Sequence, residues 1–192
     1  MGSISVEATP LPGAMLITPP RFADDRGDFS ETYNAEILAG FGVDTVFIQD
    51  NHSRSRFVGT VRGLHFQAPP KAQAKLVRVV SGRIYDVIVD IRVGSPHYGE
   101  WFGVELSADN GRQLLVPTGF LHGFVTREPD TEVIYKCSQT YSPAHEGAVR
   151  FDDPDLEIAW NLGGVAATLS PKDAAAGSWQ ALNSPFTWEQ TR

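Results

Sequence analysis

Short extended segments, each closed by turn-forming residues, recur along the chain and limit the possible folds more than any other feature. They follow one another at roughly ten-residue intervals. The 18 Gly and 13 Pro supply the turns between them, because glycine tolerates positive φ and proline cannot donate to a central ladder. The spacing predicts strands over 14–17, 45–51, 62–67, 71–80, 84–91, 99–106, 113–116, 123–127 and 132–140. Such a series is typical of an all-β sandwich or barrel.

Length and local composition indicate how the chain is divided. With 192 residues, the chain can bury a complete hydrophobic core without disulfides or metals, so we expect one domain over residues 1–192. Residues 35–40 predict a short helix that Gly40 closes. Residues 161–176 are rich in small side chains, and we expect 161–192 to be an irregular C-terminal covering segment.

Charge and cysteine content exclude several classes of protein. The net charge of −7 argues against nucleic-acid binding, which usually needs a basic face. The single Cys137 rules out an intrachain disulfide and suits a reducing compartment. No apolar run reaches the roughly 18 residues of a membrane span, and the N-terminus lacks the pattern of a signal peptide. We therefore expect a cytoplasmic protein without membrane contact.

One extended segment carries a histidine that calls for a chemical reason. The run RGLHFQ at 62–67 contains His65, and the segment after Pro69 and Pro70 contains Lys75. A strand, a turn and a second strand would place His65 and Lys75 on neighbouring strands. A base beside a cation can remove a proton and hold the resulting negative charge.

Two segments resemble the signatures of the cupin superfamily. Gly111 followed by PTGFLH at 117–122 resembles the second signature, and Gly59 followed by HFQ at 65–67 resembles the first. The resemblance implies a jelly-roll β-barrel or sandwich with a few short helices. A metal-binding cupin would have histidine at position 67 and a glutamate soon after, but here Gln67 is followed by two lysines. An ammonium group opposes a cation, so we expect no metal.

A second resemblance covers about residues 10–175 and is more specific. Six segments carry it in register: DRGDF at 25–29, QDNHS at 49–53, RGLHFQ at 62–67, GSPHYG at 94–99, PTGFLHGF at 117–124 and FDDPDL at 151–156. Together they resemble the dTDP-4-dehydrorhamnose 3,5-epimerase family. The resemblance implies a homodimeric enzyme without cofactor that epimerises a dTDP-linked 4-keto-6-deoxyhexose at C3 and C5. The apolar run at 14–17 also favours a dimer, since an open apolar edge strand is a liability.

The resemblance also implies roles for individual residues. His65 would be the base, Lys75 the group that stabilises the enolate, Tyr135 the proton donor on the opposite face, and Asp173 the carboxylate that orients His65. The positions that would line the nucleotide-sugar cleft are Arg26, Glu31, Gln49, Asn51, Arg62, His122 and Tyr141. Gln49, Asn51 and Ser53 are expected on one strand face.

One spacing and three alternatives stay open. Arg62 and His65 are three residues apart, which places them on opposite faces of a regular strand, so either Gly63 hosts a bulge or the strand begins later. The alternatives to the 3,5-epimerase are an epimerase acting only at C3, a catalytically silent cupin that binds sugar nucleotides, and a metal-dependent cupin oxygenase. Gln67 and the missing glutamate weigh against the oxygenase.

Overall fold

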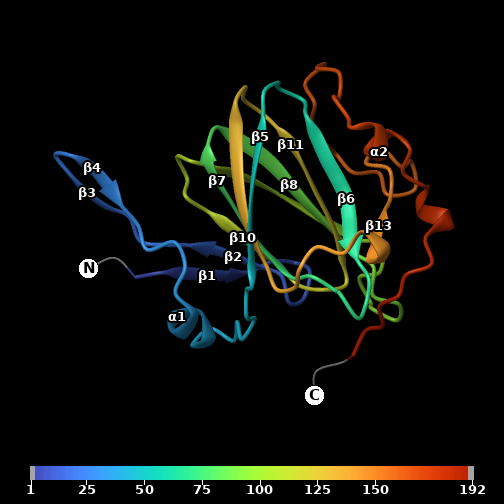
Figure 1. Ribbon diagram of the computed structural model, residues 1–192, viewed down its shortest axis with the longest axis horizontal. Helices are drawn as coiled ribbons and strands as arrows, with labels where there is room; N and C mark the ends of the chain where they lie inside the picture. Colours follow the sequence, from blue (N-terminus) through green and yellow to red (C-terminus); the bar gives the residue numbers. More distant parts are fainter. Residues whose placement is uncertain (1–2, 190–192) are drawn as a thin grey trace.

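Two antiparallel sheets packed face to face make up the body of the protein in the computed structural model, which describes residues 3–189 (Figure 1). The larger sheet has the order β1-β2-β10-β7-β12-β5, and its strands span Ser5–Ala8, Met15–Thr18, Gln113–Val116, Lys75–Ser81, Thr131–Cys137 and Gln49–Ser55. The smaller sheet has the order β13-β6-β11-β8-β9, and its strands span Glu146–Ala148, Val61–Gln67, Phe120–Thr126, Arg83–Asp90 and Trp101–Ser107. The predicted jelly-roll β fold is confirmed.

The remaining elements are short. Strands β3 (Phe22–Asp24) and β4 (Gly27–Phe29) form a separate hairpin that projects from the sandwich (Figure 1). The helices are α1 (Ala35–Ala39) and α2 (Pro171–Ala174), with 3₁₀ turns at Pro143–His145 and Trp179–Ala181. Within residues 3–189, no helix is long and apolar enough to cross a membrane.

The core between the sheets forms because strand residues alternate in direction. Val77 and Val79 of β7 point inward and meet Ile84 and Ile88 of β8, as the two-residue period of a strand requires. Burial of such side chains supplies most of the stabilisation, at roughly 25 cal/mol per Å² of apolar surface. The centre of the sandwich is thus mostly apolar, and Asp86 and His122 are buried polar side chains on the same inward faces.

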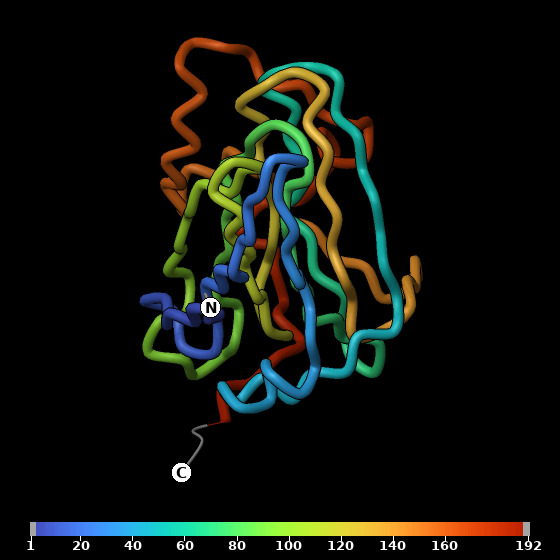
Figure 2. The backbone as a smooth tube through the Cα atoms, turned by 90° about the vertical axis from the view of Figure 1, so that its left-hand side faces the viewer, coloured from blue at the N-terminus to red at the C-terminus, as the bar shows by residue number. Residues whose placement is uncertain are grey.

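The C-terminal segment covers the outer face of the smaller sheet. Val87 and Val89 of β8 point outward and pack in one cluster with Phe151 and Trp160, and Trp179 and Phe186 pack against that cluster. In Figures 1 and 2 this orange-to-red part of the chain runs along one side of the sandwich and then toward the end where α1 lies. The covering segment brings α2 against β6.

Helix α1 covers part of the outer face of the larger sheet. Asn34 caps it by accepting hydrogen bonds from the first-turn amides, and Gly40 closes it as expected. Leu38 packs on Ile17 and Leu76 from the sheet. Strand β5 begins at Gln49, later than the predicted residue 45, because 45–48 form the connection from α1.

Two sequence-based expectations about strand neighbours were wrong. Strand β6, which carries His65, belongs to the smaller sheet, whereas β7, which carries Lys75, belongs to the larger one. The connection through Pro69 and Pro70 therefore crosses between sheets and does not form a hairpin. The apolar strand at Met15–Thr18 is not an edge either, because β1 pairs with its free side.

A bulge at Gly63 resolves the spacing of Arg62 and His65. In the pairing of β6 with β11, His65 lies opposite His122 and Arg62 opposite Phe124, so two residues of β6 face the single Gly123. Gly63 has φ of +130°, and a Cβ there would lie 2.5 Å from the Cα of Gly123. Only glycine fits this backbone, and the bulge lets Arg62 and His65 line one cavity.

Replacement of Gly63 by alanine should lower the free energy of unfolding by about 2–4 kcal/mol, because positive φ and steric crowding act together. Gly164→Ala is the matched control, since Gly164 also has positive φ (+84°) but would place its Cβ in open space. The control should lose only about 1 kcal/mol in urea unfolding. Equal losses in the two variants would show that the close approach of β6 and β11 does not matter.

Candidate active site

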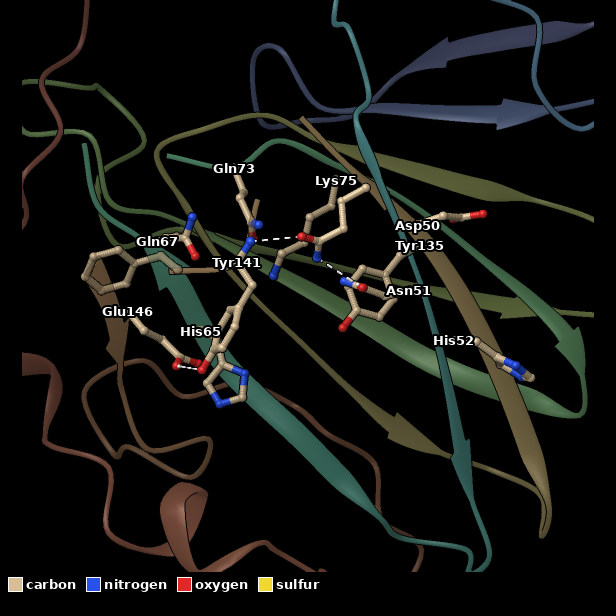
Figure 3. A pocket seen from close by; sticks show the side chains of 12 residues that line it. Asp50, Asn51, His52, His65, Gln67, Gln73, Lys75, Tyr135, Tyr141 and Glu146 are labelled. Atoms are coloured by element: carbon tan, nitrogen blue, oxygen red, sulfur yellow. Dashed lines mark hydrogen bonds between the residues drawn. The ribbon is translucent and has the colours of Figure 1, made fainter. Parts of the chain in front are cut away.

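A cleft of about 490 Å³ opens where the two sheets separate (Figure 3). Its walls come from β5, β7 and β12 of the larger sheet and from β6 and the 141–146 segment on the other side. A smaller cavity of about 220 Å³ shares His65, Lys75 and Tyr135 with the cleft. Three residues predicted from widely separated segments therefore meet in one place.

His65 is held by a carboxylate from the covering segment. Its Nε2 lies 2.5 Å from Oδ1 of Asp173, and Asp173 is 6% exposed. A carboxylate accepts the Nε2 proton, which leaves the lone pair of Nδ1 free to take a proton. The pair has the geometry of a general base with its orienting group.

Asp173 reaches this position because of local helix chemistry. Ser170 caps α2 and accepts a hydrogen bond from the Asp173 amide at 3.1 Å. Pro171 suits the first helical position, where no amide proton is needed. The single helical turn is thus defined by its own sequence, and its packing on β6 brings Asp173 to His65.

Lys75 is linked to two buried polar side chains, His122 and Asp86. The Nζ of Lys75 lies 3.5 Å from Nδ1 of His122, and Nε2 of His122 lies 2.7 Å from Oδ1 of Asp86. Asp86 has no exposed surface; its Oδ1 meets His122, while its Oδ2 has no hydrogen-bond partner among the described residues. The arrangement holds an ammonium group at the floor of the cleft.

Burial alters the proton affinities of both groups. Desolvation lowers the pKa of His65 below its ordinary 6.5; Asp173 opposes this shift, and the positive charge of Lys75 adds to it. Desolvation also lowers the pKa of Lys75 from 10.5, against the nearby Cys137, Asp86 and Glu146. At neutral pH His65 is therefore an unprotonated base.

Tyr135 lines the cleft from β12, where it lies opposite Asn51 of β5. Desolvation raises the pKa of its phenol above 10, and the Asn51 side chain opposes that shift. The phenol is consequently protonated at neutral pH and can donate. Gln49, Asn51 and Ser53 are each partly buried between exposed neighbours on β5, which confirms their shared face.

Two charged residues at the cleft were missed by sequence analysis. Glu146 lines the cleft and accepts a hydrogen bond from the Tyr141 hydroxyl at 2.8 Å (Figure 3). Lys172 lines the smaller cavity and forms a close ion pair with Glu146. Lys172 directly precedes Asp173, so the sequence could have indicated that Lys172 lies near His65 as well. Glu146 lies in none of the recognised segments, and only the pairing of β13 with β6 places it here.

The other predicted cleft residues divide into two groups. Arg62 lines the smaller cavity and donates to Ser55 and to the carbonyl of Arg54 at 3.2 Å each. Arg26 and Glu31 were predicted to line the cleft, but in this chain they line neither cavity, because the segment that carries them projects from the sandwich (Figure 1). Arg26 pairs with Asp24 in the projecting hairpin with 90% of its side chain exposed, and Glu31 accepts a hydrogen bond from Asn34.

Among residues 3–189, no three or more His, Cys, Asp or Glu side chains cluster closely enough to hold a metal ion. Gln67, at the cupin ligand position, turns its amide to backbone groups of the 71 and 140–142 segments. The cleft instead offers a base, an acid and a cation. Such a set suits proton removal next to a carbonyl group, followed by proton return.

Comparisons with known proteins agree with this chemistry. A profile of the dTDP-4-dehydrorhamnose 3,5-epimerase family matches residues 8–181. The dTDP-4-dehydrorhamnose 3,5-epimerase of Sinorhizobium fredii is 50% identical over 173 residues, which cover 90% of this chain and 88% of the relative.

Two solved structures have the same fold. RmlC of Legionella pneumophila, a dTDP-6-deoxy-D-glucose-3,5-epimerase in complex with dTDP-4-keto-L-rhamnose, has a TM-score of 0.92 and 39% identity, covering 97% of this chain and 99% of that one. ChmJ of Streptomyces bikiniensis, a 3'-monoepimerase in complex with dTDP-quinovose, has a TM-score of 0.84 and 34% identity, covering 90% and 86%. From its matching profile and its identity to this relative, the chain belongs to the dTDP-4-dehydrorhamnose 3,5-epimerase family.

Proposed function

We propose that this protein epimerises dTDP-4-dehydro-6-deoxy-D-glucose at C3 and C5 to give dTDP-4-dehydro-L-rhamnose. The observation that carries the proposal is the meeting of His65, Lys75 and Tyr135 in one cleft. Protons on the carbons beside a ketone are weakly acidic, and their removal needs a base and a counter-charge for the enolate. The cleft supplies both, and Tyr135 adds a neutral acid.

Each inversion then consists of two proton transfers. Nδ1 of His65 takes the proton from the carbon next to C4, and the electron pair of the broken C–H bond moves to the C4 oxygen. The ammonium group of Lys75 stabilises that oxyanion. Tyr135 returns a proton to the opposite face of the carbon. Exchange with solvent restores both residues, so the reaction consumes neither oxidant nor reductant.

Charged and aromatic groups around the cleft fit the dTDP moiety. Arg62 can donate to a diphosphate oxygen, since the planar guanidinium forms paired hydrogen bonds with such anions. Tyr141 is 55% exposed at the edge of the cleft and presents a ring on which a base can stack. The known ligands of related epimerases, dTDP-4-keto-L-rhamnose and dTDP-quinovose, support this assignment.

An epimerase acting at C3 alone is the second candidate. The 3'-monoepimerase ChmJ shares this fold with a TM-score of 0.84, so likeness of fold alone does not choose between one and two inversions. The higher identity to the 3,5-epimerase of S. fredii, 50% against 34%, favours two.

A homodimer would account for the position of Arg26. The hairpin β3–β4 is exposed along its whole length, and Phe29 keeps 69% of its surface in solvent. A projecting hairpin with exposed aromatic side chains is suited to reach a second copy of the chain. In that arrangement Arg26 and Glu31 would complete the cleft of the partner.

Incubation with dTDP-4-keto-6-deoxyglucose in D₂O should place deuterium at both C3 and C5 of an L-configured product, as read by NMR. The assay is run after exhaustive chelation, because Lys75 stands where a metal would be repelled. His65→Ala should lower the rate by about 10²–10⁴-fold. Label at C3 alone would assign the C3-only reaction, and a rate restored only by Fe, Mn or Zn would refute metal independence.

Tyr135→Phe should keep the exchange of substrate protons for deuterium but lose most of the inversion, because the ring remains and the donating hydroxyl is gone. The same NMR assay separates the two events. Tyr98→Phe is the control, since Tyr98 packs beside Trp179 away from the cleft. Unchanged inversion in Tyr135→Phe would require another proton donor.

The pH dependence of kcat/KM should be bell-shaped. The acid limb should lie below pH 6.5, because His65 must be neutral and its pKa is lowered. The alkaline limb should lie below pH 10.5, because Lys75 must be charged and its pKa is lowered as well. Asp173→Asn should move the acid limb to lower pH, since Asp173 raises the pKa of His65. Asp152→Asn, at an exposed pair with Arg150, should leave both limbs in place. An acid limb above 6.5 in the unaltered protein would contradict this reading.

Arg26→Ala and His65→Ala should each inactivate the protein, and mixing them after dissociation should restore activity. A heterodimer would contain one complete site, so random reassortment should return about a quarter of the original rate. Light scattering provides the check on assembly. A monomer at micromolar concentration, or no recovery on mixing, would count against an Arg26 shared between subunits.

A further inference from the structure

Four consecutive residues at the cleft mouth, 139–142, are held by three glutamine side chains from elsewhere in the fold. The Nε2 of Gln73 donates to the carbonyl of Gln139 at 2.6 Å, and the Oε1 of Gln49 accepts from the Tyr141 amide at 2.9 Å. Gln67 makes the two remaining contacts, to Thr140 and Ser142. Backbone of a loop is thus fixed by side-chain amides where strand pairing has ended.

Gln67 holds the loop on both sides of Tyr141. Its Nε2 donates to the Thr140 carbonyl at 3.0 Å and, at closer range, to the Lys71 carbonyl, while its Oε1 accepts from the Ser142 amide at 2.8 Å. Gln67 is only 5% exposed. A carboxamide has two donor hydrogens and one acceptor oxygen, so all of its groups are used. A glutamate lacks the donors, and an asparagine has a shorter reach.

The ring of Tyr141 depends on these polar anchors. Its amide is bonded to Gln49 and its hydroxyl to Glu146, while 55% of its surface stays exposed. An exposed aromatic side chain on an unsupported loop would lose rotamer freedom when a ligand stacks on it. Fixing the backbone on both sides removes part of that cost before binding.

We propose that Gln67 is a positioning residue that preorganises the 139–142 loop, and with it Tyr141, for the planar base of the nucleotide. The inference rests on the proposed function and adds to it a residue, Gln67, that acts on nucleotide binding through Tyr141. The position at which a metal-binding cupin carries a ligand serves here to hold the nucleotide-binding loop. Gln67 should therefore affect binding of the nucleotide much more than proton transfer at the sugar.

The test compares Gln67→Met with the unaltered protein by calorimetric titration with dTDP and by steady-state kinetics. Methionine keeps the volume and removes every hydrogen bond. We expect Kd for dTDP and KM for the sugar nucleotide to rise about tenfold, with kcat changed by less than about twofold. Thr131→Val is the matched control, because Thr131 is also buried and its hydroxyl donates to a loop carbonyl, that of Glu128, away from the cleft. The control should keep Kd and KM even if its thermal stability falls.

A double-mutant cycle shows whether the effect passes through Tyr141. In a Tyr141→Ala background, Gln67→Met should cause little further loss of dTDP affinity, because the ring it positions is gone. Full additivity, or equal Kd for Gln67→Met and the unaltered protein, would overturn the proposal. If Gln67→Met does not fold, Gln73→Met takes its place, because Gln73 binds the same loop at Gln139, and it should also raise Kd for dTDP. An unaltered protein that does not bind dTDP would instead refute the proposed function.

Discussion

The ionic chain from Asp86 through His122 to Lys75 is the interaction on which the open end of the sandwich depends. A carboxylate without exposed surface would be costly in an apolar core unless its charge were compensated. Nε2 of His122 lies 2.7 Å from Oδ1 of Asp86, and Nζ of Lys75 lies 3.5 Å from Nδ1 on the other side of the same ring. The chain leaves a positive charge on the cleft side of the core. A ligand in the cleft therefore faces the ammonium group of Lys75, which favours negative charge on that ligand.

The imidazole at the cleft comes from the smaller sheet and is held by a third part of the molecule. His65 stands on β6, while Asp173 arrives from α2, 108 residues later in the sequence. The covering segment that carries Asp173 also buries the outer face of the smaller sheet. The packing that stabilises the fold therefore also orients the imidazole of His65, and loosening of this segment would affect stability and the position of that ring together.

Glutamine amides connect the cleft wall to its mouth. Gln49 lies on β5, Gln67 ends β6 and Gln73 precedes β7, yet all three bind backbone of 139–142. Neutral amides suit this task because they donate and accept without adding charge near Lys75. Position 67, where a metal-binding cupin has a histidine ligand, is thus occupied here by a glutamine that holds a loop.

The sequence by itself predicted the β architecture, the short helix that Gly40 closes, and four residues that the structure brings together: His65, Lys75, Tyr135 and Asp173. Turn residues and two-residue periodicity are local signals, so they predict strands without knowledge of the whole. The sheet to which each strand belongs was decided only by tertiary structure, since β6 and β7 are consecutive but lie in different sheets. The same holds for Glu146, which reaches the cleft through pairing of β13 with β6. Long-range pairing and packing depend on side chains distant in sequence, and no local pattern encodes them.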